Sequence, residues 1–382
     1  MSIDYTHEFP LHDNLIYLNH AAVSPWPRRT AEAIQHFALE NITYGAKNYS
    51  SWEKTQEVLR ERLRSLLNAP SVTDIALLKN TSEALSVVAY GLPWKKGDNV
   101  VITHQEFPSN RIVWESLQNQ GVIVKQAMIS MSEPEKELFA QVDEHTRLIA
   151  VSSVQYATGL RMALAQIGAF CQQHNILFCI DAIQSLGALP LDVQAVAADF
   201  VMADGHKWML GPEGLAVFYC KAEQRERLQL KQFGWHMVEN AYHFDAKTWN
   251  IANSARRFEC GSPNMLGIYA LNASLSLLSE VGMSTIEQKV LENSQYLMKT
   301  LEELPDIIII TPREVERYAG IVSFRHRKTE SASLHRYLYE QSIICAHRDG
   351  NIRFSPHFYT SRFHLDQATQ SIKSWIEKNS SS

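Results

Sequence analysis

The sequence predicts an α/β fold in which a large domain with a mostly parallel sheet is followed by a smaller α+β domain. The chain has 382 residues, more than one ordinary hydrophobic core requires. Short apolar strands alternate with amphipathic helices as far as residue 220, a pattern typical of parallel sheets covered on both faces. After residue 264 helices and short strands no longer alternate regularly. We therefore expect a large domain over residues 20–264 and a small α+β domain over 265–382, with residues 1–19 packing on the small domain.

Hydrophobic periodicity predicts the individual elements in order. In the large domain, strands are expected at 75–78, 99–103, 122–127, 148–154, 176–180, 200–203 and 215–220. Helices are expected at 30–44, 53–67, 84–90, 109–119, 135–142, 165–174 and 224–232. In the small domain, helices are expected at 265–281, 284–304, 333–341 and 365–378, and strands at 307–310, 321–324, 343–346 and 352–355.

The composition argues against several classes of protein. The 36 Lys and Arg residues against 41 Asp and Glu give a net charge of -5, so no basic excess indicates nucleic acid or an anionic membrane surface as a partner. The N-terminus is polar and resembles no signal peptide, and no apolar run approaches the roughly 20 residues of a membrane helix. The five cysteines are scattered and the 15 histidines lack metal-binding spacing, so we expect no disulfide framework, no metal and a cytoplasmic location.

Two neighbouring strands end at chemically reactive side chains. The strand at 176–180 ends at Asp181, and the strand at 200–203 is followed closely by Lys207. Ligands of parallel sheets bind outside the carboxyl ends of the strands. A lone lysine after a strand is usually a surface residue, and a lone aspartate often caps a turn. Together they favour pyridoxal 5′-phosphate (PLP), which needs a lysine for a Schiff base and an acid for its ring nitrogen.

Further side chains suit the remaining parts of such a ligand. Thr81 and Ser82 open a helix, where hydroxyls and free amides can bind phosphate, although plain N-capping accounts for the same residues. Gln184, one turn after Asp181, could hydrogen-bond the ring hydroxyl. Arg353 lies on a short strand, where it is either a surface charge or a bidentate clamp on a substrate carboxylate.

Seven segments, taken in order and spacing, resemble the class V aminotransferase family of fold-type I PLP enzymes. That family includes cysteine desulfurases, selenocysteine lyase, kynureninase and isopenicillin N epimerase. The segments are YLNHAA (17–22), NTSEA (80–84), EFPSN (106–110), DAIQ (181–184), GHKW (205–208), GSPN (261–264) and RFSPH (353–357). The resemblance covers nearly the whole chain and implies the PLP-dependent transferase fold type I.

The resemblance also implies a role for each matching position. Lys207 would bind the cofactor covalently and move the substrate proton, and Phe107 would stack on the ring. The implied cofactor-binding set is Thr81, Ser82, Phe107, Asp181, Gln184, His206, Lys207 and Ser262. Ser262 would reach the phosphate of a second subunit, which implies a homodimer with shared active sites. The implied substrate-binding set is Arg353, Asn19, His20 and Tyr156, the last in a segment where desulfurases carry an asparagine.

Two departures from the family pattern bear on function. Asp204 stands where relatives often have a small residue, and because a carboxylate repels phosphate, we exclude Asp204 from the phosphate set. No cysteine lies between Cys260 and Cys345, and Cys345 is expected in a buried strand, where a thiol is inert. We therefore predict an enzyme acting on the α-carbon of an amino acid, with an aminotransferase favoured over a cysteine desulfurase-like enzyme or C–S lyase and over an epimerase. A protein of this fold that binds ligand without turnover is the remaining alternative.

Overall fold

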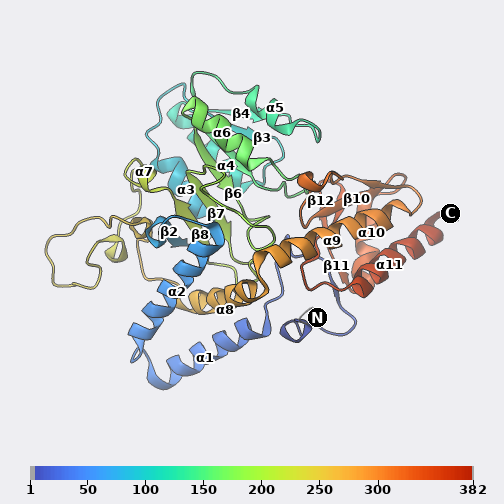
Figure 1. The fold of residues 1–382 in the computed structure, drawn as a ribbon, viewed down its shortest axis with the longest axis horizontal. Coiled ribbons are helices and arrows are strands. Elements are labelled where there is room, and N and C mark those ends of the chain that lie inside the picture. The colour runs from blue at the N-terminus through green and yellow to red at the C-terminus, as the bar shows by residue number, and fades with distance from the viewer. Residues whose placement is uncertain (1–4, 381–382) are drawn as a thin grey trace.

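A seven-stranded sheet forms the centre of the large part of the molecule in the computed structural model, which describes residues 5–380 (Figure 1). Its strands lie in the order β2 (Ile75–Leu78), β8 (Ala216–Cys220), β7 (Phe200–Asp204), β6 (Leu177–Asp181), β5 (Thr146–Ser152), β3 (Asn99–Thr103) and β4 (Ile123–Ala127). The pairs from β7 to β4 are parallel, and β8 runs antiparallel to both β7 and β2. The predicted mostly parallel sheet is therefore confirmed.

Alternate residues of these strands enter two different hydrophobic clusters, because successive side chains of a strand point to opposite faces. Val100 and Ile102 belong to one cluster, and Val101 belongs to the other. The first face is covered by α3 (Thr81–Gly91) and α4 (Ser109–Glu115). The second face is covered by α2 (Tyr49–Leu67), α5 (Pro134–Phe139), α6 (Leu164–His174) and α8 (Met265–Val281). This double covering explains why the inner strands β6, β7 and β8 are largely apolar and buried, whereas the edge strand β4 carries Lys125 and Gln126 and is partly exposed.

The C-terminal part has a sheet of its own. Four strands pair antiparallel in the order β12 (Ala346–Arg348), β13 (Asn351–Phe354), β10 (Val322–His326) and β9 (Ile307–Ile309). The helices α9 (Met283–Glu302), α10 (Ser331–Glu340) and α11 (Arg362–Ser380) complete this part. Near the N-terminus, β1 (Ile16–Tyr17) pairs with β11 (Ile343–Ile344), and Leu18 enters the C-terminal cluster.

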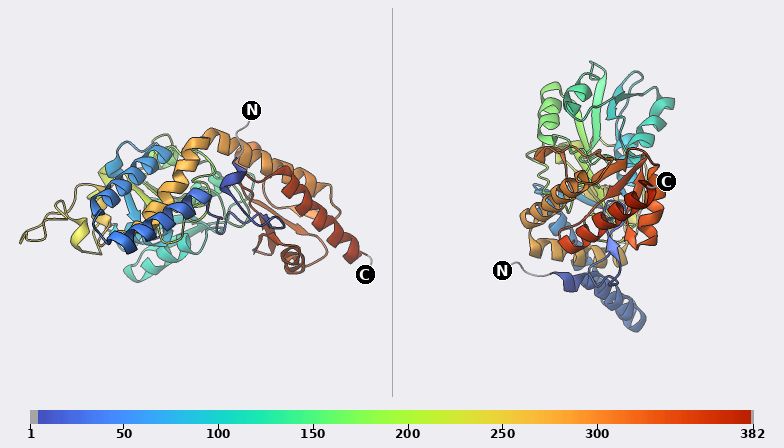
Figure 2. Two further views of the ribbon diagram at one scale, coloured as in Figure 1. Left: turned by 90° about the horizontal axis from the view of Figure 1, so that it is seen from below. Right: turned by 90° about the vertical axis from the view of Figure 1, so that its right-hand side faces the viewer.

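The predicted domain limits at residues 20 and 265 remain predictions. Helices that follow residue 264 pack on both parts of the molecule. α8 packs against α1 (Arg28–Tyr44) and α2, and its apolar side chains share the cluster under the large sheet. α9 contributes Ile286 and Val290 to that cluster, and Leu297 and Leu301 to the C-terminal one. Figure 2 shows this helix running from one part of the molecule to the other. Residues 1–4 and 381–382 of the predicted domains lie outside the described residues.

The predicted helix at 224–232 is wrong over most of its length. The helix α7 covers only Ala222–Arg225. Beyond it, the Gln229 N–H donates to the Gly91 carbonyl at 2.8 Å, and Leu228 is buried beside Gly91. These contacts with the end of α3 take the place of helical hydrogen bonds. The charged sequence pattern could not reveal them, because they join segments far apart in the chain.

Within the described residues, no single helix has both the length and the apolar composition needed to cross a membrane. α8 and α9 meet that test only together, as a pair bent by 84°.

Candidate active site

The ends of β6 and β7 bring Asp181 and Lys207 into one buried region. The two strands pair side by side, with Asp181 opposite Met202. Asp181 is 1% exposed and Lys207 is 8% exposed. Burial raises the pKa of Asp181 to about 7, although a 3.0 Å hydrogen bond from the Ile183 N–H and the charge of Lys207 act against this rise. Burial likewise lowers the pKa of Lys207 to about 8, so its amine loses the proton close to neutral pH.

A series of contacts leads from Lys207 to Arg353. The Lys207 Nζ lies 5.6 Å from the centroid of the Phe107 ring, which meets the Tyr156 ring edge to face at 5.1 Å. The Arg353 Nη1 donates to the Tyr156 carbonyl at 2.8 Å. Burial lowers the pKa of Arg353 to about 9, so the guanidinium is still charged at pH 7. Four residues that the sequence predicted are therefore neighbours in the structure.

The start of α3 supplies hydroxyls and amides at the same edge of the sheet. The Asn80 side chain caps the helix by accepting from the Glu83 N–H at 2.9 Å. The Asp204 N–H donates to the Thr81 Oγ1 at 3.1 Å, which leaves the Thr81 hydroxyl proton for another acceptor. His206 Nδ1 and Asp204 Oδ1 are 3.0 Å apart, but their alignment makes no hydrogen bond and neither atom has another partner among the described residues.

Three other residues predicted to bind the cofactor, Gln184, Ser82 and Ser262, are surrounded by other parts of the chain. The Gln184 amide donates to the Ala21 carbonyl at 3.1 Å and accepts from the Trp208 indole at 3.2 Å. The Ser82 hydroxyl donates to Ser109 at 2.8 Å. Ser262 lines a cavity of about 260 Å³ that none of the other predicted site residues lines. The contacts of these three residues with the cofactor therefore stay predictions.

The N-terminal segment lies against the strand that carries Arg353. Asn19 forms a bridge to Ser355, two residues after Arg353. The His20 ring is fully buried, with Nδ1 at 2.7 Å from the Ser355 carbonyl and Nε2 at 2.6 Å from the Tyr359 hydroxyl. Both ring nitrogens of His20 are thus engaged within the chain, and its contact with a substrate remains a prediction.

The region contains buried polar atoms that lack partners. Of ten such side-chain atoms among the described residues, five lie on segments of the predicted site. They are Asn19 Oδ1, Gln155 Oε1 and Arg353 Nε, together with Asp204 Oδ1 and His206 Nδ1, which lie 3.0 Å apart without a hydrogen bond between them. Buried polar atoms are nearly always paired, so this concentration indicates a place built for a polar ligand. An amine, a buried carboxylate, a helix N-terminus, a hydroxyl group and an imidazole are the groups that PLP would require of its site.

Glu106 is a residue whose part in the site our sequence analysis did not identify. Its buried carboxylate accepts hydrogen bonds from the side chains of Asn110, Ser152 and Gln155 at 2.5 to 3.0 Å. This arrangement fixes the loop that presents Phe107. The only signal in the sequence was the position of Glu106 inside the EFPSN segment.

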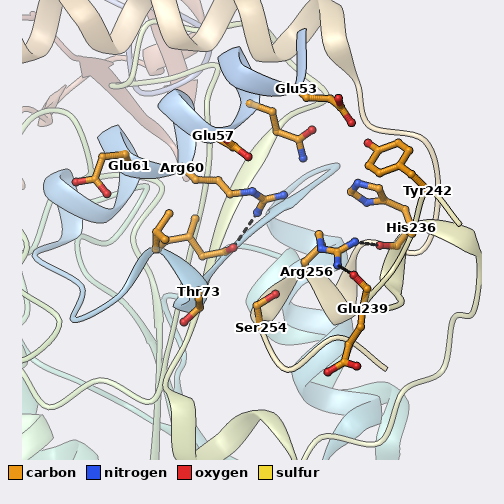
Figure 3. Close-up of a pocket in the computed structure, with 14 residues that line it drawn as sticks. Glu53, Glu57, Arg60, Glu61, Thr73, His236, Glu239, Tyr242, Ser254 and Arg256 are labelled. Carbon is orange, nitrogen blue, oxygen red and sulfur yellow. Dashed lines mark hydrogen bonds between the residues drawn. The ribbon is translucent and has the colours of Figure 1, made fainter. Parts of the chain in front are cut away.

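A larger cavity of about 560 Å³ lies away from these residues, between α2 and the loop at 235–256 (Figure 3). The Arg256 guanidinium donates to the carbonyls of His236, Val238 and Glu239 at 2.6 to 3.0 Å. Arg60 donates from the other side to the Ile75 carbonyl at 2.8 Å. The cavity contains none of the predicted catalytic groups, and its arginines hold the surrounding backbone in place.

Comparison with known proteins identifies the family. Residues 16–360 match the family Aminotransferase class-V. A probable cysteine desulfurase of Methanothermobacter thermautotrophicus is 30% identical over 350 residues, which are 90% of this chain and 86% of the relative. A cysteine desulfurase of Yersinia pseudotuberculosis is 29% identical over 321 residues, 81% of this chain and 77% of the relative. The chain therefore belongs to the class V aminotransferase family, and it is a PLP-dependent enzyme.

Solved structures agree on the fold. The apo cysteine desulfurase of Thermococcus onnurineus NA1 has a TM-score of 0.87 at 24% identity and covers 98% of both chains. The cystine C–S lyase C-DES, in complex with its reaction product cysteine persulfide, has a TM-score of 0.89 at 22% identity and covers 94% of this chain and 98% of its own. The names of the relatives favour the cysteine desulfurase alternative over the aminotransferase that the sequence led us to expect.

Proposed function

We propose that this protein cleaves the Cβ–Sγ bond of a cysteine-derived amino acid and that it acts as a C–S lyase, without transferring sulfur to a thiol of its own. The state of Cys345 carries this choice. Its side chain is buried, and burial raises the pKa of the thiol to about 12, so it is not a nucleophile. No cysteine precedes it back to Cys260. β-Elimination needs no enzyme thiol, because the sulfur leaves on the substrate fragment.

The residues of the site suit the steps of such an elimination. PLP supplies an electron sink for negative charge at the substrate α-carbon. Arg353 would bind the α-carboxylate, and its free Nε offers a further donor. The Lys207 amine would remove the α-proton, as its lowered pKa permits. The Cβ–Sγ bond then breaks and its electron pair goes to sulfur. From cystine, the products after hydrolysis are cysteine persulfide, pyruvate and ammonia.

The remaining side chains would hold and orient the cofactor. Asp181 would accept a hydrogen bond from the protonated ring nitrogen, and the positive charge of that nitrogen would keep this carboxylate ionised. The free hydroxyl proton of Thr81 supports its assignment to the phosphate, and the family resemblance assigns His206 to the same group. Ser82 would join them through the amides at the start of α3.

We further propose a homodimer in which Ser262 reaches the second active site. The loop at 233–258 projects from the end of the molecule opposite the C-terminal part (Figures 1 and 2). Phe233, Phe244 and Trp249 on this loop are all more than half exposed, and exposed aromatic groups of this kind favour an interface. Sedimentation of the purified protein tests the proposal, and a monomer at micromolar concentration would contradict it.

Product analysis distinguishes the three reactions. PLP-loaded enzyme is incubated with L-cystine and with L-cysteine, and pyruvate, alanine and persulfide are quantified. A C–S lyase yields pyruvate with persulfide from cystine, and Cys345→Ala retains this activity. Alanine as the product, lost in a cysteine variant, would establish a desulfurase instead. A sulfur-containing keto acid that forms without ammonia would establish an aminotransferase.

A further inference from the structure

The turn that carries Lys207 is held by donors from two distant segments of the chain. The Ser24 N–H donates to the His206 carbonyl at 2.8 Å, and the Ser24 hydroxyl donates to the Lys207 carbonyl at 2.5 Å. The His357 Nε2 lies 3.1 Å from the Trp208 carbonyl. Three successive carbonyl groups around Lys207 therefore accept hydrogen bonds from outside the turn.

Ser24 acts on both peptide groups that flank the Lys207 α-carbon. One of its bonds fixes the peptide before Lys207, and the other fixes the peptide after it. Only two soft dihedral angles per residue set the backbone, so these bonds hold the direction in which the lysine side chain leaves the turn. Ser24 is 4% exposed, so water cannot easily replace its hydroxyl.

His357 has a defined protonation state in which it can serve as a donor. The Phe358 N–H donates to His357 Nδ1 at 2.8 Å, which makes Nδ1 an acceptor and assigns the ring proton to Nε2. The ring is fully buried, and burial lowers its pKa to about 4. The imidazole therefore remains neutral and donates to Trp208 throughout the range in which the enzyme would work.

The turn itself needs such support. Leu210 has a φ of +60°, a left-handed conformation that leucine rarely adopts. Gly187 and Gly320 both lie against Trp208, so closely that a side chain at either position would clash with it. A strained backbone persists only where its surroundings determine it.

We propose that Ser24 and His357 form a clamp that positions Lys207 and couples it to the strand that carries Arg353. His357 follows Arg353 by four residues, and the Asn293 side chain of α9 fixes the His357 carbonyl at 3.0 Å. Movement of the strand that holds the substrate carboxylate would therefore reach the Trp208 peptide directly. The inference rests on the proposed function, because Lys207 is the residue that the clamp serves.

The test measures the ionisation of Lys207 in the cofactor-free full-length chain. Trace acetylation at a series of pH values, with Lys207 read by peptide mass spectrometry, should give a midpoint well below the ordinary lysine value in the wild type, near 8. Asp181 and Asp204 raise this pKa, whereas Arg353 and Arg348 lower it. A loosened turn admits water, so the midpoint moves toward the ordinary lysine value of about 10.4.

Five variants separate positioning from stability. Ser24→Ala and His357→Phe remove one donor each and are expected to raise the Lys207 midpoint. Ser24→Thr keeps a hydroxyl and His357→Gln keeps an N–H donor, and both should restore the wild-type midpoint. His326→Phe is the matched control, because His326 is also buried but lies on β10 beside Trp375. In the PLP-loaded enzyme, Ser24→Ala and His357→Phe should each lower kcat about tenfold and leave KM unchanged.

The inference fails if Ser24→Ala and His357→Phe keep the wild-type midpoint, or lower only the melting temperature as His326→Phe does. The acetylation measurement is made without cofactor and without substrate. Failure of the clamp is therefore distinguishable from failure of the proposed function, which would appear as a wild-type protein without C–S cleavage.

Discussion

We predict that the cofactor-free Asp181→Asn variant gains stability relative to the wild type as the pH rises from 5 to 8. The unfolded aspartate titrates near 3.9, whereas burial raises the pKa of the folded Asp181 to about 7. Between these values the folded state binds the extra proton. The stability that Asp181 contributes is thus present at low pH and is lost as the pH rises through 7. The carboxyl group is half ionised at pH 7, so at 1.36 kcal/mol per unit the loss between pH 5 and pH 7 is about 2 kcal/mol.

Urea unfolding of the cofactor-free chain at pH 5, 6, 7 and 8 measures this difference. Asparagine resembles the protonated carboxyl group and can still accept from the Ile183 N–H, so the Asp181→Asn variant should lack the pH-dependent loss. Asp192→Asn is the control, because hydrogen bonds from Gln194 and Ala195 lower the pKa of that carboxyl group, which therefore does not titrate in this range. A difference between Asp181→Asn and wild type that is the same at all four pH values would refute the reasoning.

Two further predictions concern binding. Arg353→Lys should raise KM for the amino acid substrate at least about tenfold, because the bidentate bond is lost, and should leave the visible band of the bound cofactor in place. Steady-state kinetics measure KM, and an unchanged value would remove Arg353 from the substrate site. Thr81→Val should weaken PLP binding about tenfold through loss of a hydrogen bond to phosphate. Fluorescence titration measures this affinity, and wild-type affinity in Thr81→Val would remove Thr81 from the phosphate site.

The sequence predicted the elements around the cofactor because their signals are local. Apolar strands that end at Asp181 and near Lys207 needed no knowledge of distant residues. The polar residues Thr81 and Ser82 marked the start of a helix, and the structure shows that helix capped by the preceding side chain, Asn80. The family resemblance then placed Arg353 in the same site, where a hydrogen bond to Tyr156 links it to the loop beside Lys207.

The features that the sequence could not reveal depend on contacts between distant segments. The bonds from Ser24 and His357 to the lysine turn join residues more than 140 positions apart. The Gln184 amide is held by Ala21 and Trp208, which its position one turn after an aspartate does not indicate. These contacts arise from tertiary packing, which hydrophobic periodicity does not specify.

The attachment point of the cofactor tests the central claim most directly. The purified protein is loaded with PLP, reduced with borohydride, digested and analysed by mass spectrometry. We predict that the reduced cofactor is found on the peptide containing Lys207, and that Lys207→Ala carries none and has no visible band. Attachment to a different lysine, or a wild-type protein that remains colourless with added PLP, would contradict the account.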